Sequence, residues 1–277
     1  MTSPLVSASD LAVALAGPRP PVVLDVRWKL GGPPGAGEYA KGHLPSAVYV
    51  DLDTELAGHG APTDGRHPLP PIAVFEAAAR RWGVRHGEAV VVYDDVSGLS
   101  AARAWWLLRH AGVEDVRVLD GGLRAWEGAL STEDAHPERG DVSLSYGALP
   151  TLDADGAAAV ARDGVLLDAR AGERYRGEAE PVDPRAGHIP GAVSAPTAGN
   201  VGPDGRMLAP AALAERFAAL GVRPEASVGV YCGSGVTAAH EALALEAAGL
   251  PMPALYPGSF SAWSNDPARE VAAGAEP

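Results

Sequence analysis

The sequence predicts an α/β protein built from two similar domains, each a mainly parallel β-sheet flanked by helices on both faces. Two observations lead to this prediction. The chain repeats its own pattern once, and within each copy short Val, Leu and Ile runs alternate with alanine-rich amphipathic stretches. Strands that alternate with helices are typical of parallel sheets, because each crossover places a helix over one face of the sheet. A chain of 277 residues is long enough for two domains of ordinary size.

The repeat consists of four pairs of matching segments that occur in the same order in both halves. They are "VVLDVRW" (22–28) with "VLLDARA" (165–171), "GHLPSAVYV" (42–50) with "GHIPGAVSA" (187–195), "VVVYDDVSGLSAARAWWLL" (90–108) with "VGVYCGSGVTAAHEALAL" (228–245), and "LDGGLRAW" (119–126) with "YPGSFSAW" (256–263). A single repeat of this length indicates a duplicated domain, since the units of a solenoid are only about 20–50 residues long.

The boundary between the copies falls in the segment 128–156, which is polar and punctuated by glycine and proline. This composition is typical of a link between domains. We therefore expect one domain over residues 1–146 and a second over residues 147–277.

Four helices are predicted from the amphipathic stretches. They are Ile72–Trp82, Ala101–Ala111, Ala211–Leu220 and Thr237–Ala248. A glycine stands at the end of each stretch, at Gly83, Gly112, Gly221 and Gly249. Glycine is the preferred residue just after a helix, because it adopts the left-handed conformation that ends one.

Composition limits the class of protein. Hydrophobic residues make up 47% of the chain and charged residues 21%, as in a globular protein and unlike a disordered one. The net charge of −13 disfavours nucleic acid or an anionic membrane as the main partner, although a local basic pocket can still bind a small anion. No apolar run approaches the ~20 residues that span a bilayer, and the first residues lack the regions of a signal peptide. We expect a cytoplasmic protein.

The chain has one cysteine, Cys232, which excludes an internal disulfide, a CxxC redox pair and a cysteine-rich zinc site. No metal or cofactor is expected. The residues around the cysteine predict a strand over Val228–Tyr231, a loop over Cys232–Val236 and a helix from Thr237 onward. Ligands of parallel sheets bind where strands end and the following helices begin. The thiol is therefore expected at a binding position.

The predicted loop suits an anionic sulfur. Gly233 and Gly235 permit positive φ, so that successive N–H groups can turn toward one point, and the start of the helix adds further N–H donors and a partial positive charge. Together these groups stabilise a thiolate, or an anion carried on its sulfur. The alternative is that Cys232 is a small buried hydrophobic residue, as many lone cysteines are. The glycine spacing favours the reactive role.

Three other uses of a cysteine loop fit less well. Tyrosine phosphatases need an arginine six residues after the cysteine to clamp the phosphate, and Ala238 stands there in this chain. A zinc site lacks ligands. A cysteine protease needs a paired histidine, and the nearest one, His240, lies inside the predicted helix.

These segments together resemble the tandem-domain rhodanese (sulfurtransferase) family over nearly the whole chain. The resemblance rests on the duplication, on "GHIPGA" and "PGSFSAW", and on the loop "CGSGVT", which is similar to that of the 3-mercaptopyruvate sulfurtransferases. The thiosulfate-using branch typically has cationic side chains just after the cysteine, where this chain has Gly233 and Ser234. The resemblance implies an inactive N-terminal domain, with Asp94 at the position of Cys232, and a C-terminal domain whose cysteine carries sulfur as a persulfide.

The resemblance also implies a set of site residues. Cys232 is the sulfur carrier, and Ser234, His67 and Asp53 match an Asp–His–Ser relay that reaches across the domain interface. Arg174 matches the arginine that binds the anionic end of the substrate. The remaining residues implied in substrate binding are those of the loop, Gly233, Gly235, Val236 and Thr237.

A second substrate-binding arginine is expected soon after Arg174, but Val182 stands at that place, which leaves Arg185 as a weak candidate. Without the resemblance, Arg174 is equally well explained as a surface ion pair, and His67 and Ser234 as ordinary loop residues. The loop of the first copy, "DDVSGLS" (94–100), lacks the first glycine and has one extra residue. Its N–H groups are therefore not expected to close around a sulfur at position 94.

The sequence thus predicts an enzyme that moves a sulfane sulfur from a small anionic donor, with 3-mercaptopyruvate favoured, through Cys232 to a thiophilic acceptor such as cyanide, a small thiol or thioredoxin. One alternative is a thiosulfate sulfurtransferase of the same family. An alternative of another class is a non-catalytic sulfur-relay or binding module, in which Cys232 only docks a partner. The intact glycine loop ahead of a helix favours the enzyme.

Overall fold

The computed structural model describes residues 3–277 and divides into two compact units. Unit 1 contains the described residues up to Gly58, Pro70–Ala148 and Pro203–Met207, and unit 2 contains His59–Leu69, Leu149–Gly202 and Leu208–Pro277. The domain limits 1–146 and 147–277 stay a prediction. In the structure, the short segment 59–69 packs in unit 2 although its sequence neighbours on both sides belong to unit 1.

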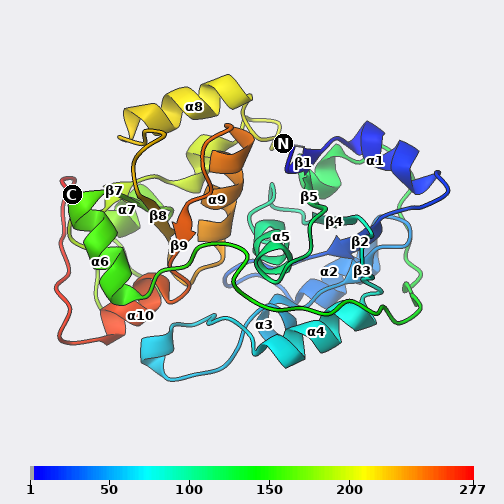
Figure 1. Ribbon diagram of the computed structural model, residues 1–277, viewed down its shortest axis with the longest axis horizontal. Helices are drawn as coiled ribbons and strands as arrows, with labels where there is room; N and C mark the ends of the chain where they lie inside the picture. The colour runs from blue at the N-terminus through cyan, green and yellow to red at the C-terminus, as the bar shows by residue number, and fades with distance from the viewer. Residues whose placement is uncertain (1–2) are drawn as a thin grey trace. The chain divides into compact units, whose positions relative to one another are not determined.

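Unit 1 contains a five-stranded parallel sheet in the order β1-β5-β4-β2-β3 (Figure 1). Its strands are β1 (Leu5–Val6), β2 (Val22–Asp25), β3 (Val48–Tyr49), β4 (Val90–Tyr93) and β5 (Val116–Leu119). Successive residues of a strand point to opposite faces. Val23 packs in one apolar cluster with Leu11 of α1 (Ala8–Leu15), while α5 (Ala101–His110) contacts β4 and β5 and buries Trp105 and Trp106.

Unit 2 repeats this plan with a four-stranded parallel sheet in the order β7-β6-β8-β9. Its strands are β6 (Val165–Asp168), β7 (Val193–Ser194), β8 (Val228–Tyr231) and β9 (Ala254–Leu255). The register is the same in both units: Leu24 pairs with Val92 in unit 1, and Leu167 pairs with Val230 in unit 2. The helices α6 (Ala154–Asp163) and α9 (Thr237–Ala247) lie on different sides of β8 (Figure 1). The predicted α/β fold of two similar parallel sheets flanked by helices is confirmed.

The other helices are short or follow the predicted amphipathic stretches. They are α2 (Gly35–Lys41), α3 (Leu52–Glu55), α4 (Ile72–Arg81), α7 (Gly172–Tyr175), α8 (Pro210–Ala219) and α10 (Ser259–Asn265), with 3-10 turns η1 (Pro62–Asp64), η2 (Gly122–Ala125) and η3 (Thr197–Asn200). The four predicted helices are α4, α5, α8 and α9, and each end lies within about a residue of its predicted place. The glycines that follow them all have positive φ, from 76° to 95°, as helix ends of this type require. Within residues 3–277 no helix is both long and apolar enough to cross a membrane.

Candidate active site

Cys232 lies at the carboxyl end of β8, five residues before α9 begins at Thr237. This is the strand, loop and helix predicted from the sequence. The thiol is buried, and its Sγ accepts a hydrogen bond from the N–H of Gly235 at 3.1 Å. Gly235 has a φ of +79°, a conformation that glycine adopts without strain. The loop thus directs a backbone donor at the sulfur.

Val236 and Thr237 complete the loop at the start of α9. Val236 is the N-cap residue and is buried, and Thr237 is the first residue of the helix. The first N–H groups of a helix have no partner inside the helix and carry its positive dipole end. The start of α9 is therefore suited to an anion at the end of β8.

The segment "PGSFSAW" supports the cysteine loop from α10. The N–H of Cys232 donates to Ser259 Oγ at 3.2 Å, and the N–H of Phe260 donates back to the carbonyl of Cys232 at 2.9 Å. The N–H of Ser261 donates to the carbonyl of Gly233, also at 2.9 Å. Ser259 has a φ of +53°, a conformation that costs a non-glycine residue about 1–3 kcal/mol and persists only where the surrounding structure holds it. These bonds fix the backbone on both sides of the sulfur.

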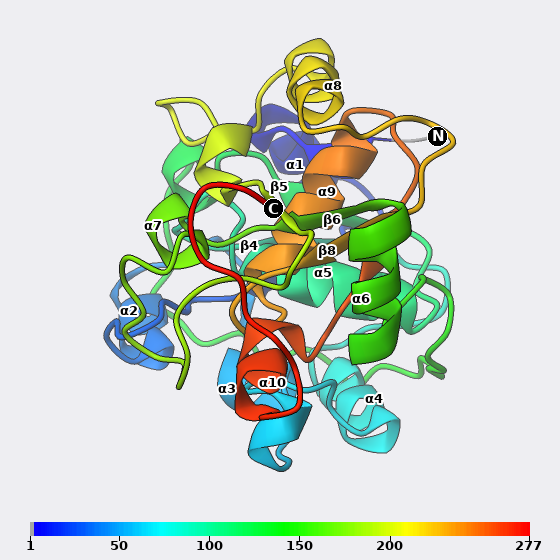
Figure 2. The same cartoon turned by 90° about the vertical axis from the view of Figure 1, so that its left-hand side faces the viewer.

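His67 and Ser234 are brought together within unit 2. Ser234 Oγ lies 2.8 Å from His67 Nδ1, although the two residues are 167 positions apart. The segment that carries His67 is held in place by η1, which contacts α10 (Figure 2), and by the N–H of Arg66, which donates to Ser261 Oγ at 3.1 Å. Two residues of the predicted relay are therefore in hydrogen-bonding distance.

Asp53, the third residue of the predicted relay, belongs to unit 1. It lies in α3, and its Oδ1 accepts a hydrogen bond from Trp28 Nε1 at 3.0 Å. Its part in the relay stays a prediction.

Two guanidinium groups lie against Gly233, the residue after the cysteine. A Cβ atom added to Gly233 would stand 3.0 Å from Arg66 Nη2 and 3.3 Å from Arg174 Nη1. A larger residue at this position would therefore have to displace one of the two arginines. Arg174 was predicted to bind substrate and lies beside the loop, whereas Arg66 was missed. The loop is neutral in sequence, but two cations flank it in space.

Two buried carboxylates hold these arginines. Asp183 pairs through one oxygen with Arg66 Nη1, and its other oxygen accepts from Arg174 Nη2 at 3.0 Å. Glu180 accepts from Arg174 Nη2 at 2.7 Å and from Nε at 3.2 Å. Burial raises the pKa of Asp183 above its ordinary value, against the opposing effect of Arg66. Burial also acts to raise the pKa of Glu180, but the bonds from Arg174 and from backbone N–H groups outweigh it and lower that pKa.

Arg185 has a different setting. Its guanidinium donates to the backbone carbonyls of Trp263, Ser264, Asp266 and Arg269, at distances of 2.7–2.8 Å. Four such bonds hold the end of α10 and the chain that follows it. The structure therefore places Arg185 in the support of α10 and does not bring it into the arginine and carboxylate cluster at Gly233.

The first copy has a comparable loop, filled by its own side chain. The carboxylate of Asp94 accepts N–H bonds from Val96, Gly98, Ser100 and Ala101 at 2.8–2.9 Å. The missing glycine and the extra residue do not prevent this loop from gathering N–H groups around the Asp94 carboxylate. That these groups would not close around a sulfur at position 94 stays a prediction. The position of Cys232 is thus taken in unit 1 by a buried carboxyl group, whose pKa is raised by burial against the opposing effect of these N–H bonds.

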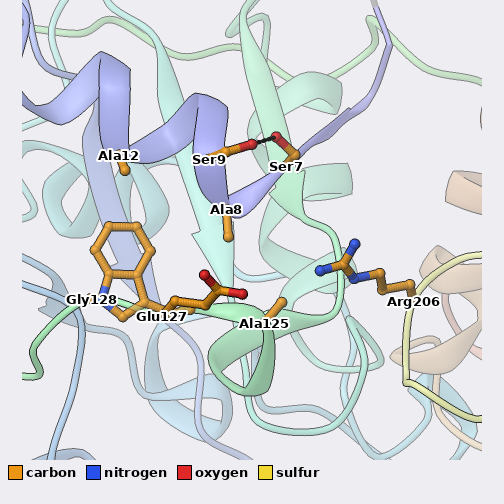
Figure 3. A pocket seen from close by; sticks show the side chains of 9 residues that line it. Ser7, Ala8, Ser9, Ala12, Ala125, Glu127, Gly128 and Arg206 are labelled. Carbon is orange, nitrogen blue, oxygen red and sulfur yellow. Dashed lines mark hydrogen bonds between the residues drawn. The ribbon is translucent and has the colours of Figure 1, made fainter.

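Unit 1 also contains a separate cavity of about 250 Å³ beside α1 and η2 (Figure 3). Its charged side chains are Glu127 and Arg206, and none of the predicted site residues lines it. Within residues 3–277, no group of three or more His, Cys, Asp and Glu side chains is arranged to hold a metal ion.

One feature of the sequence could have indicated that Arg66 lies near the site. Arg66 directly precedes His67 in "GRHPLP", so that a segment chosen for its histidine also carries a cation. Asp183 directly follows Val182, where the second arginine of the family was expected, but a carboxylate in an acidic segment gave no sign of its two partners.

The chain is similar to known proteins along most of its length. The family described as "Rhodanese-like domain" matches residues 7–129 and 153–266. A protein of Pseudomonas aeruginosa, provisionally named 3-mercaptopyruvate sulfurtransferase, is 46% identical over 282 residues, which cover 98% of both chains. A Mycobacterium tuberculosis protein, provisionally named thiosulfate sulfurtransferase SseB, is 46% identical over 279 residues, which cover 98% of this chain and 97% of the relative.

A solved structure shows the same fold. The crystal structure of SseA from Escherichia coli, described as a 3-mercaptopyruvate sulfotransferase with the "Rhodanese" fold, superimposes with a TM-score of 0.80. The match covers 93% of this chain and 99% of that protein at 32% identity.

Proposed function

Because the chain belongs to the family of proteins with rhodanese-like domains, we propose that it is a sulfurtransferase that carries sulfur on Cys232 as a persulfide. The sulfur comes from a small anionic donor, with 3-mercaptopyruvate preferred to thiosulfate, and passes to a thiophilic acceptor such as cyanide, a small thiol or thioredoxin. One observation supports this most directly: the single thiol of the chain stands at a strand end with a loop N–H directed at its sulfur, at 3.1 Å.

The chemistry has two steps. In the first, the thiolate of Cys232 attacks the donor sulfur and the bond between that sulfur and the rest of the donor breaks, with its electron pair leaving on the remainder. With mercaptopyruvate, the remainder leaves as the enolate of pyruvate, which must gain a proton on carbon, and the thiol proton of the donor stays on the outer sulfur until the persulfide ionises. With thiosulfate, the remainder leaves as sulfite and the persulfide forms as an anion. In the second step the acceptor attacks the outer sulfur and the Cys232 thiolate departs.

The proposed roles follow from the contacts. The N–H groups of the loop, including that of Gly235, and the start of α9 stabilise the anionic persulfide. Ser234, hydrogen-bonded to His67, supplies or relays the proton that the enolate needs, with Asp53 as the proposed third member. Arg174 binds the anionic group of the donor. Asp94, which fills the N–H loop of unit 1, leaves that domain inactive.

The choice of donor is supported by the relatives and by Ser234. The P. aeruginosa and E. coli proteins are named for 3-mercaptopyruvate, and the M. tuberculosis protein for thiosulfate. The reaction with thiosulfate needs no proton, because sulfite leaves as a stable anion. Ser234, hydrogen-bonded to His67, can therefore act as a proton donor with mercaptopyruvate but has no such role with thiosulfate. A cytoplasmic location is part of the same proposal.

The test is the mass of the intact chain after incubation with each donor and no acceptor. The wild-type protein should gain one sulfur, about 32 Da, and Cys232→Ser should gain none while keeping its circular dichroism spectrum. Turnover by Cys232→Ser within about tenfold of wild type would rule out the persulfide mechanism. A persulfide that forms but passes to neither cyanide nor thiols would favour the non-catalytic relay module.

A further inference from the structure

Arg66 and Arg174 face Gly233 with nitrogens that the surrounding carboxylates do not use. The bonds to Asp183 and Glu180 come from Nη1 of Arg66 and from Nε and Nη2 of Arg174. The atoms nearest to Gly233 are Nη2 of Arg66 and Nη1 of Arg174. In addition, Nε of Arg66 is buried and has no hydrogen-bond partner among the described residues. The carboxylates therefore bind the guanidinium nitrogens that point away from Gly233. The nitrogens that point toward the cysteine loop, Nη2 of Arg66 and Nη1 of Arg174, are not used by these carboxylates.

The two arginine side chains are also more exposed to solvent than the carboxylate of Asp183. The side chains of Arg66 and Arg174 are 27% and 15% exposed, whereas that of Asp183 is 1% exposed. An anion that arrives from solvent thus meets the arginines before it meets the carboxylate between them. A planar guanidinium binds a carboxylate or a sulfonate-like group through two N–H bonds, so a pair of them suits a small anion.

On this basis we infer that Arg66 is the second donor-binding arginine of the site, which stands in for the one absent at Val182. Together with Arg174, it binds the anionic group of the donor beside Gly233, and Asp183 positions both guanidinium groups. The inference rests on the proposed function, because it takes the donor to be the anion that reacts at Cys232. It does not rest on which of the two donors is preferred, since both are anionic.

The first test replaces Arg66 and measures KM and kcat separately with mercaptopyruvate and with thiosulfate. Arg66→Gln should raise KM about tenfold to a hundredfold for both donors, as expected for a lost contact to a desolvated charge, with a smaller change in kcat. The KM of Arg66→Lys should lie between those of the wild type and Arg66→Gln, because an ammonium group keeps the charge but lacks the planar pair of N–H donors of a guanidinium. The matched control is Arg176→Gln, an arginine of the same unit that pairs with exposed Glu178. An Arg66→Gln KM equal to that of the control would overturn the inference.

A second variant separates donor binding from a structural role. Arg66→Gln alone leaves the buried carboxylate of Asp183 with one partner fewer, which could displace Arg174 and raise KM indirectly. The double variant Arg66→Gln/Asp183→Asn removes that unpaired charge. If Arg66 binds the donor, the double variant keeps the raised KM. If Arg66 only neutralises Asp183, the double variant returns toward the wild-type KM and the inference is wrong.

A binding measurement keeps this inference distinct from the proposed reaction. Pyruvate has the keto-acid group of mercaptopyruvate and no sulfur, so its binding to the Cys232→Ser protein, followed by NMR titration, needs no transfer. Arg66→Gln in that background should weaken pyruvate binding about tenfold or more, and Arg176→Gln should leave it unchanged. Unchanged pyruvate binding in Arg66→Gln refutes the role of Arg66, whereas absence of a persulfide in the wild-type protein refutes the proposed function.

Discussion

The hydrogen bond between Ser234 and His67 gives a direct way to separate the two donors. We predict that Ser234→Ala lowers kcat/KM with mercaptopyruvate by about 10²-fold or more, the usual contribution of a positioned acid or base. With thiosulfate the loss should be small, because sulfite leaves without a proton. His67→Gln should show the same pattern. Steady-state kinetics with both donors, side by side, measures the ratio.

The control for this prediction is Ser227→Ala, which removes an exposed hydroxyl from unit 2. Ser227→Ala should leave kcat/KM unchanged with both donors. Equal losses of kcat/KM with both donors in Ser234→Ala would mean that the hydroxyl stabilises the loop and transfers no proton. Thiosulfate would then replace mercaptopyruvate as the proposed donor.

Among the residues singled out in the sequence, Ser234 and His67 lie in hydrogen-bonding distance and Arg174 lies beside Gly233, while their roles stay predictions. The cationic surroundings of the loop were not predicted. The neutral residue at Gly233 suggested a loop without cations, yet Arg66 and Arg174 stand within 3.3 Å of the place where its side chain would be. Charge near a site depends on which segments fold against it, and Arg66 comes from a position 167 residues before Gly233. The absence of a cation in the loop is therefore no argument against thiosulfate, and among the site residues the proposed preference for mercaptopyruvate rests on Ser234 and His67.

The loop after β4 provides a stability test. The carboxylate of Asp94 accepts two N–H bonds on each oxygen. Asp94→Asn keeps the size of the side chain but turns one acceptor into a donor that faces two N–H groups. We predict a loss of about 2–3 kcal/mol in the free energy of unfolding, measured by urea denaturation.

Asp95→Asn is the matched control, because Asp95 is the next residue and is exposed. It should change the free energy of unfolding by less than about 0.5 kcal/mol. Similar values for the two variants would show that the N–H groups around Asp94 find other partners.

The elements that the sequence predicted best are the long amphipathic helices. The helices α4, α5, α8 and α9 are at least 10 residues long, and each is followed by a glycine with positive φ that marks its end. In α9 every residue from Ala238 to Leu245 is buried, so its alanine-rich composition and its glycine indicate the helix, not a 3.6-residue period. The helix α6 is equally long but was not predicted, because it begins inside the polar segment 128–156. The four residues of α7 and the seven of α2 are too short for such a period, and "GERYRG" was noted only for its arginine. The two-residue strands β3 and β7 are fixed by pairing with their neighbours, which a single segment cannot reveal.

A buried acid in α9 makes the stability of the folded chain depend on pH. Glu241 is fully buried, and burial raises its pKa from 4.5 to about 7, against the opposing effects of Arg216 and Asn200. Above pH 4.5 the unfolded chain releases this proton while the folded chain keeps it. The free energy of unfolding therefore falls as the pH rises from about 4.5 to about 7, by on the order of 3 kcal/mol.

We predict that Glu241→Gln removes this fall, since glutamine keeps an oxygen for the bond from Asn200 Nδ2 (2.7 Å) and carries no proton to lose. Urea unfolding at pH 5 and pH 8 measures it: the advantage of the variant over wild type should be larger at pH 8. Glu215→Gln, an exposed residue of α8, is the control and should show no such change. An advantage of Glu241→Gln that is equal at both pH values contradicts the prediction.

The short segment 59–69 bears on how such a chain can evolve. A duplication normally frees one copy to decay or to be deleted, and the copy without a cysteine would be the one to go. Here that copy encodes Arg66 and His67, which pack in the other unit beside Gly233 and Ser234. With the proposed roles of Arg66 and His67, selection on the cysteine-bearing copy acts on the first copy as well, and a shortened gene that kept only residues 149–277 would lose both side chains together.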